Sequence, residues 1–200
     1  MAHIKSAWEI ALERTSDIKS DKSSVRANEL KREGQKIASE YVNADSPDPK
    51  TLSSRLKEYS KEERKEVEKS VFEVLLSQIS LPRNNQFKEK LETAKKGLGE
   101  LTGETKKIGG IVDQIGSFFE QYLQYQEQIS EQLKKQYEPQ LKKKQEQLSR
   151  QYGYSVELRP EQDPEFNQIL QSNLEQLEEQ YRQALNKARD EIRSITGYAG

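Results

Sequence analysis

The chain has 200 residues, of which 34% are charged and 32% hydrophobic, and its formal net charge at pH 7 is −1. The near-zero net charge excludes a global field that would recruit nucleic acid or an anionic membrane. The absence of cysteine excludes disulfides, thiol chemistry and thiolate-rich metal sites.

A low content of apolar residues is typical of a disordered chain or of elongated helices that each bury one stripe of side chains. The apolar residues recur at helical spacing, which favours elongated helices. The N-terminus lacks an apolar signal core, because charged residues such as Lys5 and Glu9 interrupt it. The most apolar run, Val71–Leu81, is too short to span a bilayer and contains Glu73. We therefore expect a cytoplasmic protein without a membrane span.

The N-terminal part contains two predicted helices. Residues 3–14 place their apolar side chains on one face, and Trp8 is the expected anchor in the core. Residues 16–24 are polar and rich in serine, which indicates a flexible segment. A second helix is predicted over 24–42, where Gly34 weakens the centre by about 1 kcal/mol relative to alanine.

Two helix boundaries are marked in the middle of the chain. After a brief helix at 51–58, Ser60 and Glu63 have the spacing of a capping box, which predicts that a helix starts there. Pro82 is expected to end that helix. The next helix is predicted over 85–96, and three glycines then allow the chain to turn into a long helical arm. These glycines are Gly97, Gly99 and Gly103.

The C-terminal part is organised as two long apolar stripes joined by a short turn. Apolar residues recur every three or four positions over 108–148 and again over 166–195, so two helices should pair antiparallel. Pro139 is expected to kink the first helix without breaking it. Asp163, followed by Pro164, predicts the start of the second helix.

Charge supports this antiparallel pairing. Residues 134–150 hold six basic and two acidic side chains, whereas residues 164–180 hold four acidic and no basic ones. Folding about the turn should place these blocks side by side and select the register. The sequence thus predicts an all-α fold, with a small helical head at 1–101 and an antiparallel coiled-coil hairpin at 102–200, whose tip covers 152–163.

Three segments of the chain carry a resemblance to a known group of proteins. They are Ile4–Glu13, Tyr137–Leu141 and Gln162–Phe166. With these segments the chain resembles an uncharacterised family of bacterial helical proteins, a domain of unknown function. The resemblance implies a bacterial cytosolic setting and assigns no reaction, ligand or catalytic residue.

The sequence offers no residues for catalysis, cofactor binding or metal binding. His3 is the only histidine, and the many carboxylates alternate with lysine and arginine, as is typical of solvated helix faces. We therefore predict a protein that is no enzyme, with no cofactor, no metal and no small-molecule substrate. Lys142–Lys144 could contact nucleic-acid phosphates, but the facing acidic arm should neutralise them.

A long two-helix projection without catalytic groups suggests a structural or adaptor protein that binds a protein partner or a second copy of itself. A chaperone-like client binder is the alternative, and a nucleic-acid-binding protein is a third class. The candidate contact residues are Tyr154, Val156 and Leu158, whose alternation with polar residues predicts a short extended segment. Either this segment caps its own hairpin, with Tyr152 and Phe166 beneath it, or it pairs with a partner strand.

Overall fold

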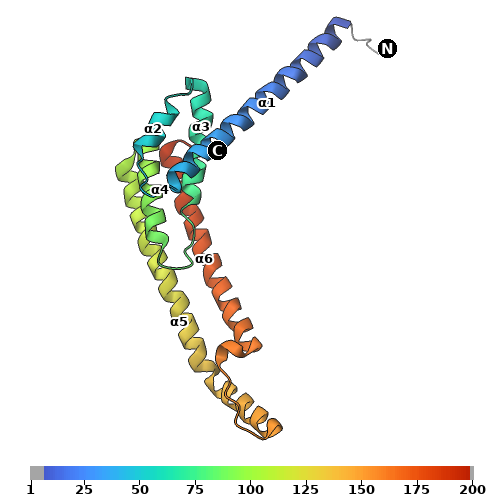
Figure 1. The fold of residues 1–200 in the computed structure, drawn as a ribbon, viewed down its shortest axis with the longest axis vertical. Helices are drawn as coiled ribbons and strands as arrows, with labels where there is room; N and C mark the ends of the chain where they lie inside the picture. The colour runs from blue at the N-terminus through green and yellow to red at the C-terminus, as the bar shows by residue number, and fades with distance from the viewer. Residues whose placement is uncertain (1–6, 199–200) are drawn as a thin grey trace. The chain divides into compact units, whose positions relative to one another are not determined.

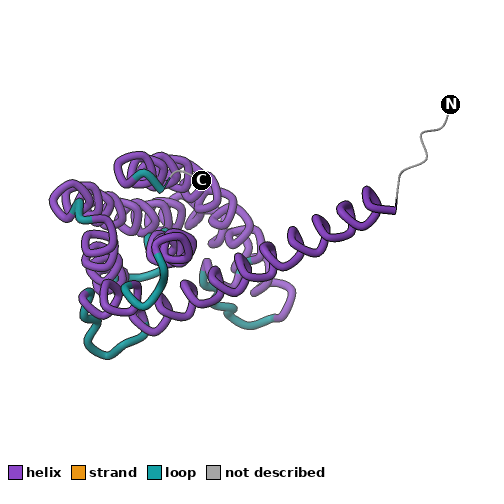
Figure 2. The backbone as a smooth tube through the Cα atoms, turned by 90° about the horizontal axis from the view of Figure 1, so that it is seen from above, coloured by secondary structure: helices purple, strands orange, loops and turns teal. Residues whose placement is uncertain are grey.

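The computed structural model describes the backbone of residues 7–198 and the side chains of residues 23–198. Its helices are α1 (Ala7–Val42), α2 (Lys50–Leu56), α3 (Lys61–Ser77), α4 (Phe87–Thr102), α5 (Thr105–Tyr152) and α6 (Pro164–Thr196), with a 3-10 helix at Pro160–Gln162. No strand occurs in this described range, so the predicted all-α fold is confirmed (Figure 1, Figure 2). None of the described helices combines the length and the apolar character that crossing a bilayer requires.

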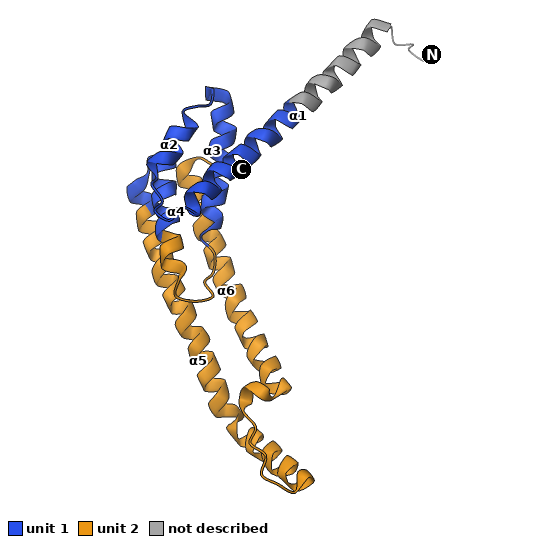
Figure 3. Ribbon diagram, viewed as in Figure 1, with its two compact units in different colours: residues 1–79, 92–108, 200 blue, residues 80–91, 109–199 orange. Residues whose placement is uncertain are grey.

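The chain divides into two compact units, which Figure 3 shows in different colours. Unit 1 consists of residues 1–79, 92–108 and 200, and unit 2 consists of residues 80–91 and 109–199. Unit 1 therefore contains α1, α2 and α3, unit 2 contains α6 and most of α5, and α4 contributes to both. The predicted domain boundary between residues 101 and 102 stays a prediction.

The first helix is continuous over 36 residues, so the predicted flexible segment at 16–24 is wrong. That segment contains neither glycine nor proline, and the helix penalties of its serine and aspartate residues are each well under 1 kcal/mol. The free-energy cost of these polar residues is too small to end a helix that continues on both sides. The side chain of Trp8, predicted to anchor the core, lies outside the described residues.

α1 and α3 approach each other closely at Gly34. A Cβ atom at this position would lie 2.6 Å from the Val67 carbonyl oxygen and 2.7 Å from Ser70 Cβ. Gly34 thus permits a close helix–helix contact, a role that its helix propensity does not reveal. The side chains buried around this contact are Leu30, Ile37, Ala38, Val67 and Val71.

The predicted start of α3 is confirmed and its predicted end is wrong. The Glu63 backbone N–H donates to Ser60 Oγ at 3.4 Å, and the Ser60 hydroxyl donates to Glu63 Oε2 at 3.1 Å. The helix ends at Ser77, before Pro82. Proline mainly restricts the residue directly before it, so Pro82 does not determine where the preceding helix ends.

The glycines after α4 have two different roles. α4 continues through Gly97 and Gly99, and the left-handed residue of the turn is Gly103, with φ +73°. A Cβ at Gly97 would lie 2.8 Å from Tyr41 Cε1 and 3.0 Å from Leu75 Cδ2. The prediction of a turn at all three glycines is therefore wrong, because Gly97 allows close packing inside unit 1 and Gly103 alone makes the turn.

Unit 2 contains the predicted helical hairpin (Figure 3). The Phe118 and Tyr181 rings stack at 4.3 Å, and the Tyr137 and Phe166 rings meet edge to face at 5.4 Å. Later residues of α5 thus meet earlier residues of α6, as antiparallel helices require. α5 continues unbroken through Pro139, as predicted, and Figure 1 shows it as one curved helix. The coiled-coil character of the pair stays a prediction.

The register of the hairpin differs from the predicted one. Residues 153–163 run back along α5, so α6 begins beside Tyr137, and the last turns of α5 lie against this connecting segment. The basic block therefore meets one acidic residue of the 3-10 helix and one in the first turn of α6: Lys134 Nζ lies 3.0 Å from Glu161 Oε1, and Lys144 Nζ lies 2.7 Å from Glu165 Oε2. Among the described residues, Glu165 is the one member of the predicted acidic block that pairs with the basic block.

Candidate functional site

The tip segment is held against α5 by hydrogen bonds from alternate residues. Gly153, with φ +76°, ends α5 and reverses the chain. The Val156 backbone N–H donates to Ser149 Oγ at 2.9 Å, and Gln145 Nε2 donates to the Leu158 carbonyl at 2.7 Å. Residues 155–159 belong to no helix or strand, so the segment lies outside the helices, and its predicted extended conformation stays a prediction.

The three predicted contact residues differ in exposure. Tyr154 is 65% exposed, whereas Val156 is half-buried and Leu158 packs against the buried cluster of Tyr137, Leu141 and Phe166. The capping alternative places Tyr152 beneath the segment, but Tyr152 is 56% exposed and its ring stacks on that of Tyr154, with 5.9 Å between the ring centres. The outer face of the tip therefore carries a pair of tyrosines, and its inner face is Leu158.

A cluster of polar side chains lies where α6 begins. The Tyr137 hydroxyl donates to Asp163 Oδ2 at 2.9 Å, and Lys144 Nζ donates to both the Tyr137 hydroxyl, at 2.8 Å, and Asp163 Oδ2, at 2.7 Å. Lys144 also contacts Glu165 Oε2. Asp163 is 4% exposed and caps α6, because its Oδ1 accepts the Glu165 backbone N–H at 3.0 Å. The predicted cap is confirmed, and we call these four residues the junction cluster.

Each titratable group of the junction cluster is held in its ordinary charge state. Hydrogen bonds to Asp163, Glu165 and Tyr137 raise the pKa of Lys144. Burial alone would raise the pKa of Asp163, but hydrogen bonds from Lys144, Tyr137 and the Glu165 N–H outweigh burial and lower it. Burial raises the pKa of Tyr137. At neutral pH the cluster therefore holds a fixed ion pair and a neutral phenol, an arrangement suited to setting register.

Only part of the junction cluster is recognisable from sequence patterns. The spacing predicts Asp163 as a cap, whereas Lys144 belongs to a basic block and Tyr137 to the apolar stripe. A usable signal was present, because the two segments Tyr137–Leu141 and Gln162–Phe166, which carry the resemblance described above, supply three of the four cluster residues. The structure brings these two segments together.

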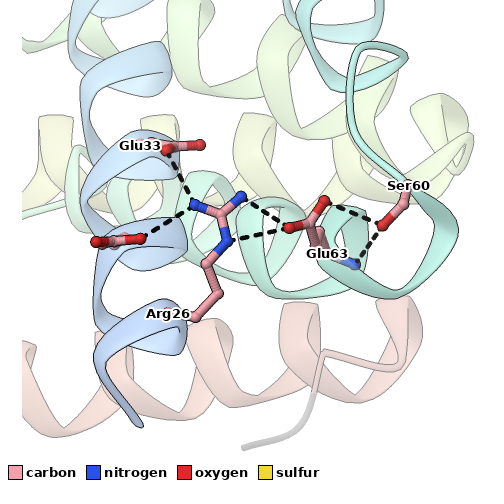
Figure 4. A network of polar contacts seen from close by, with 5 residues as sticks. Arg26, Glu33, Ser60 and Glu63 are labelled. Carbon is pink, nitrogen blue, oxygen red and sulfur yellow. Dashed lines mark hydrogen bonds and ion pairs between the residues drawn. The ribbon is translucent and has the colours of Figure 1, made fainter. Parts of the chain in front are cut away.

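A second polar network joins α1 to the start of α3 in unit 1 (Figure 4). Arg26 Nε and Nη2 donate to Glu63 Oε1 at 3.0 and 2.7 Å, and Arg26 Nη1 donates to Glu29 Oε2 at 3.1 Å. Hydrogen bonds from Arg26 and Ser60 lower the pKa of Glu63. Because the Arg26 side chain is 45% exposed, we interpret this network as solvent-exposed ion pairs that link α1 and α3 and contribute little to stability.

The described side chains include no group of three or more histidine, cysteine, aspartate or glutamate residues that could hold a metal ion. They also include no buried side-chain nitrogen or oxygen without a hydrogen-bond partner. His3, the only histidine of the chain, lies outside the described residues.

Comparison of the sequence with known proteins assigns the chain to a family. The model of a family of unknown function, DUF6657, matches residues 53–194, a range that includes the whole hairpin tip and the junction cluster. No curated protein and no solved structure matches the chain. The predicted resemblance to a family of unknown function is confirmed, and the bacterial setting stays a prediction. The chain belongs to the DUF6657 family.

Proposed function

We propose that the chain is a structural or adaptor protein that catalyses no reaction and acts through protein–protein contacts at the tip of its hairpin. The observation that carries this proposal is the exposed, stacked pair of Tyr152 and Tyr154. Tyrosine is enriched in protein interfaces, because it offers a large contact area with few rotatable bonds. Two such rings at a chain reversal form a compact surface for a protein partner or a second copy.

The tip contacts support a fixed surface. The hydrogen bond from the Val156 N–H to Ser149 and the one from Gln145 to the Leu158 carbonyl hold the backbone on both sides of Glu157. The tyrosine pair is therefore attached to a segment with little freedom to move. Pre-organisation of this kind lowers the entropic cost of binding. Tyr154 is exposed, as a residue that contacts a partner must be, while Leu158 packs against the hairpin, as a capping residue must. Different residues of the tip thus fit the two alternatives, partner contact and capping.

The proposal that no reaction occurs is supported by the junction cluster, whose groups do not titrate near neutral pH. A nucleic-acid role receives less support, because carboxylates already neutralise part of the basic block: Lys134 pairs with Glu161, Lys142 with Glu138 at 2.7 Å, and Lys144 with Asp163. The cytoplasmic location expected from the sequence also stays a prediction.

The test uses the double substitution Tyr152→Ser and Tyr154→Ser. Affinity purification from native cells would measure partner recovery, and sedimentation would measure self-association. Tyr125→Ser is a matched control, because Tyr125 is an exposed tyrosine of α5 outside the tip. We expect the double variant to lose the partner or the self-association while retaining its thermal stability, and the control to keep both.

Other results would contradict the adaptor role. Equal recovery of partners by the double variant and the unaltered protein would exclude the tip as the contact surface. Suppression of the aggregation of a denatured client, lost in the double variant, would instead assign the tip to a chaperone-like client binder. A salt-dependent shift of DNA or RNA at physiological ionic strength would assign the protein to the third class.

A further inference from the structure

A pocket of about 650 Å³ lies within unit 2. Its walls are the residues Ser80–Arg83 between α3 and α4, Tyr122 and Gln126 of α5, and one side of α6 from Glu178 onwards. The volume falls in the range of about 300–1,000 Å³ that is usual for sites of small molecules. The size of the pocket therefore fits a small ligand better than a macromolecule.

The pocket lining is basic. It contains three guanidinium groups, those of Arg83, Arg182 and Arg189, and one carboxylate, that of Glu178. The hydrogen bond to Glu178 raises the pKa of Arg182 and commits this carboxylate to that arginine. Arg182 Nη1 also lies 4.0 Å from Glu179 Oε2, so the excess positive charge in the lining is that of Arg83. An arginine guanidinium group binds carboxylate and phosphate groups through two parallel hydrogen bonds. The excess of positive charge is therefore suited to binding an oxyanion.

One wall of the same pocket is apolar. Tyr122 and Leu185 are buried, and Leu81 and Pro82 face the same space. The Tyr122 hydroxyl accepts a hydrogen bond from Gln126 Nε2 at 2.9 Å and keeps its own proton for another acceptor. Burial raises the pKa of Tyr122, so this hydroxyl remains a donor at neutral pH. A ligand that is anionic at one end and apolar at the other would match both walls.

We propose that this pocket binds a small organic oxyanion, a carboxylate or phosphate attached to an apolar group. Arg83 and the Arg182 N–H groups that do not bind Glu178 hold the anionic group, and Tyr122 and Leu185 contact the apolar group. This proposal is independent of the contact surface at the tip, since none of these residues belongs to residues 152–163.

The first experiment compares simple probes on the full chain at low ionic strength, with binding followed by NMR or calorimetry. Phenylacetate and phenyl phosphate represent the two anionic groups, 2-phenylethanol lacks the charge, and acetate lacks the apolar group. We expect saturable binding of at least one aromatic anion, about tenfold tighter than that of either 2-phenylethanol or acetate. The stronger of the two anions identifies the preferred oxyanion. Failure of both anions to saturate, or equal binding of acetate, would overturn the proposal.

The second experiment locates the site. Arg83→Gln and Arg182→Gln should each weaken binding of the preferred anion about tenfold, because each removes a charged hydrogen-bond donor. Arg150→Gln is the matched control, since Arg150 is an exposed arginine of α5 outside the pocket. Circular dichroism would verify that each variant keeps its helices. Equal weakening by Arg150→Gln would show only a general charge effect and would overturn the assignment.

Discussion

The two buried polar side chains in the described part of the chain, Ser70 in unit 1 and Asp163 in unit 2, are held in different ways. Ser70 is 7% exposed, is neutral and donates one hydrogen bond to the Lys31 carbonyl of α1 at 2.7 Å. Asp163 is 4% exposed, is charged and accepts from Lys144, Tyr137 and the Glu165 backbone N–H. A neutral group needs one partner, whereas a buried charge needs several.

The difference reflects how each pair of helices is packed. α1 and α3 approach closely, because Gly34 has no side chain and Ser70 has a small one. In the hairpin, aromatic rings such as Phe118 and Tyr181 separate the helices, and a charged cluster forms where α6 begins. Shape therefore specifies the contact in unit 1, while charge contributes to the register in unit 2. Substitutions at the two places should have different costs and different pH dependences.

The largest effect is expected for Asp163→Ala. The change removes the N-cap of α6, which is worth about 0.5–2 kcal/mol. It also leaves the buried Tyr137 hydroxyl with only its longer bond, to Glu165 Oε2 at 3.3 Å, which costs about 1–3 kcal/mol. Together these terms predict a loss of about 1.5–5 kcal/mol in the free energy of unfolding, measured by urea denaturation. Asp163→Asn is the control, since it keeps a capping oxygen and should lose less. A loss below about 1 kcal/mol for Asp163→Ala would contradict the role of the junction cluster.

Acid should remove the advantage of Asp163 over asparagine. Its folded pKa is lowered, so the carboxylate stabilises the fold at pH values above its unfolded pKa, near 4. This contribution is lost as the pH falls through the lowered folded pKa. We therefore expect unfolding free energies of the native chain and Asp163→Asn to converge below about pH 4. A constant difference from pH 7 to pH 2 would show that the ionised carboxylate contributes nothing.

Much of the helical architecture was predictable, because it depends on local signals. The caps at Ser60 and Asp163 involve hydrogen bonds within three residues, and the apolar stripes of the hairpin repeat at the helical period. Close contacts were not predictable, since Gly34 and Gly97 look like weak helix positions until the side chains facing them are known. A glycine within a helix can therefore indicate a packing contact.

The tip illustrates the same limit at the candidate site. The alternation of Tyr154, Val156 and Leu158 predicts a short extended segment, but it does not reveal which side faces α5. That orientation depends on a hydrogen bond to Ser149 and one from Gln145, residues that lie several positions away along the chain. The register of the hairpin was missed for the same reason, because residues 153–163 run back along α5 before α6 begins.

Two glycine-to-alanine substitutions should distinguish the effect of helix propensity from the effect of a close contact between helices. Gly34→Ala places a Cβ atom 2.6 Å from a backbone oxygen, so α1 and α3 must move apart, at an expected cost of about 1–3 kcal/mol. Gly110→Ala adds a methyl group with no neighbour within 4 Å and should stabilise α5 by about 0.5–1 kcal/mol. Thermal or urea unfolding would measure both changes. Stabilisation by both alanines would contradict the close contact.

Tyr41→Phe tests how much a buried, uncharged hydroxyl contributes to the stability of unit 1. The Tyr41 hydroxyl donates to the Thr93 carbonyl at 3.0 Å, and its removal should cost about 1 kcal/mol at neutral pH. Burial, with smaller contributions from Asp48 and Glu92, raises the pKa of Tyr41 to about 12. The unfolded chain loses this proton near pH 10, so the native protein should lose stability between about pH 10 and pH 12. Tyr41→Phe should reduce that alkaline loss, and an unchanged slope would contradict the assignment.

The smallest effect is expected for Ser70→Ala, which tests the neutral partner in the opening comparison. The change removes one hydrogen bond to the Lys31 carbonyl, whose net contribution is about 0.5–1.5 kcal/mol. Alanine also has a higher helix propensity than serine, by a few tenths of a kcal/mol, and it fits the space beside Gly34. We therefore expect a loss of about 0.5–1 kcal/mol that does not change between pH 4 and pH 9, measured by urea denaturation. A loss as large as that of Asp163→Ala would mean that the two buried polar groups are equivalent and that charge does not distinguish the two units.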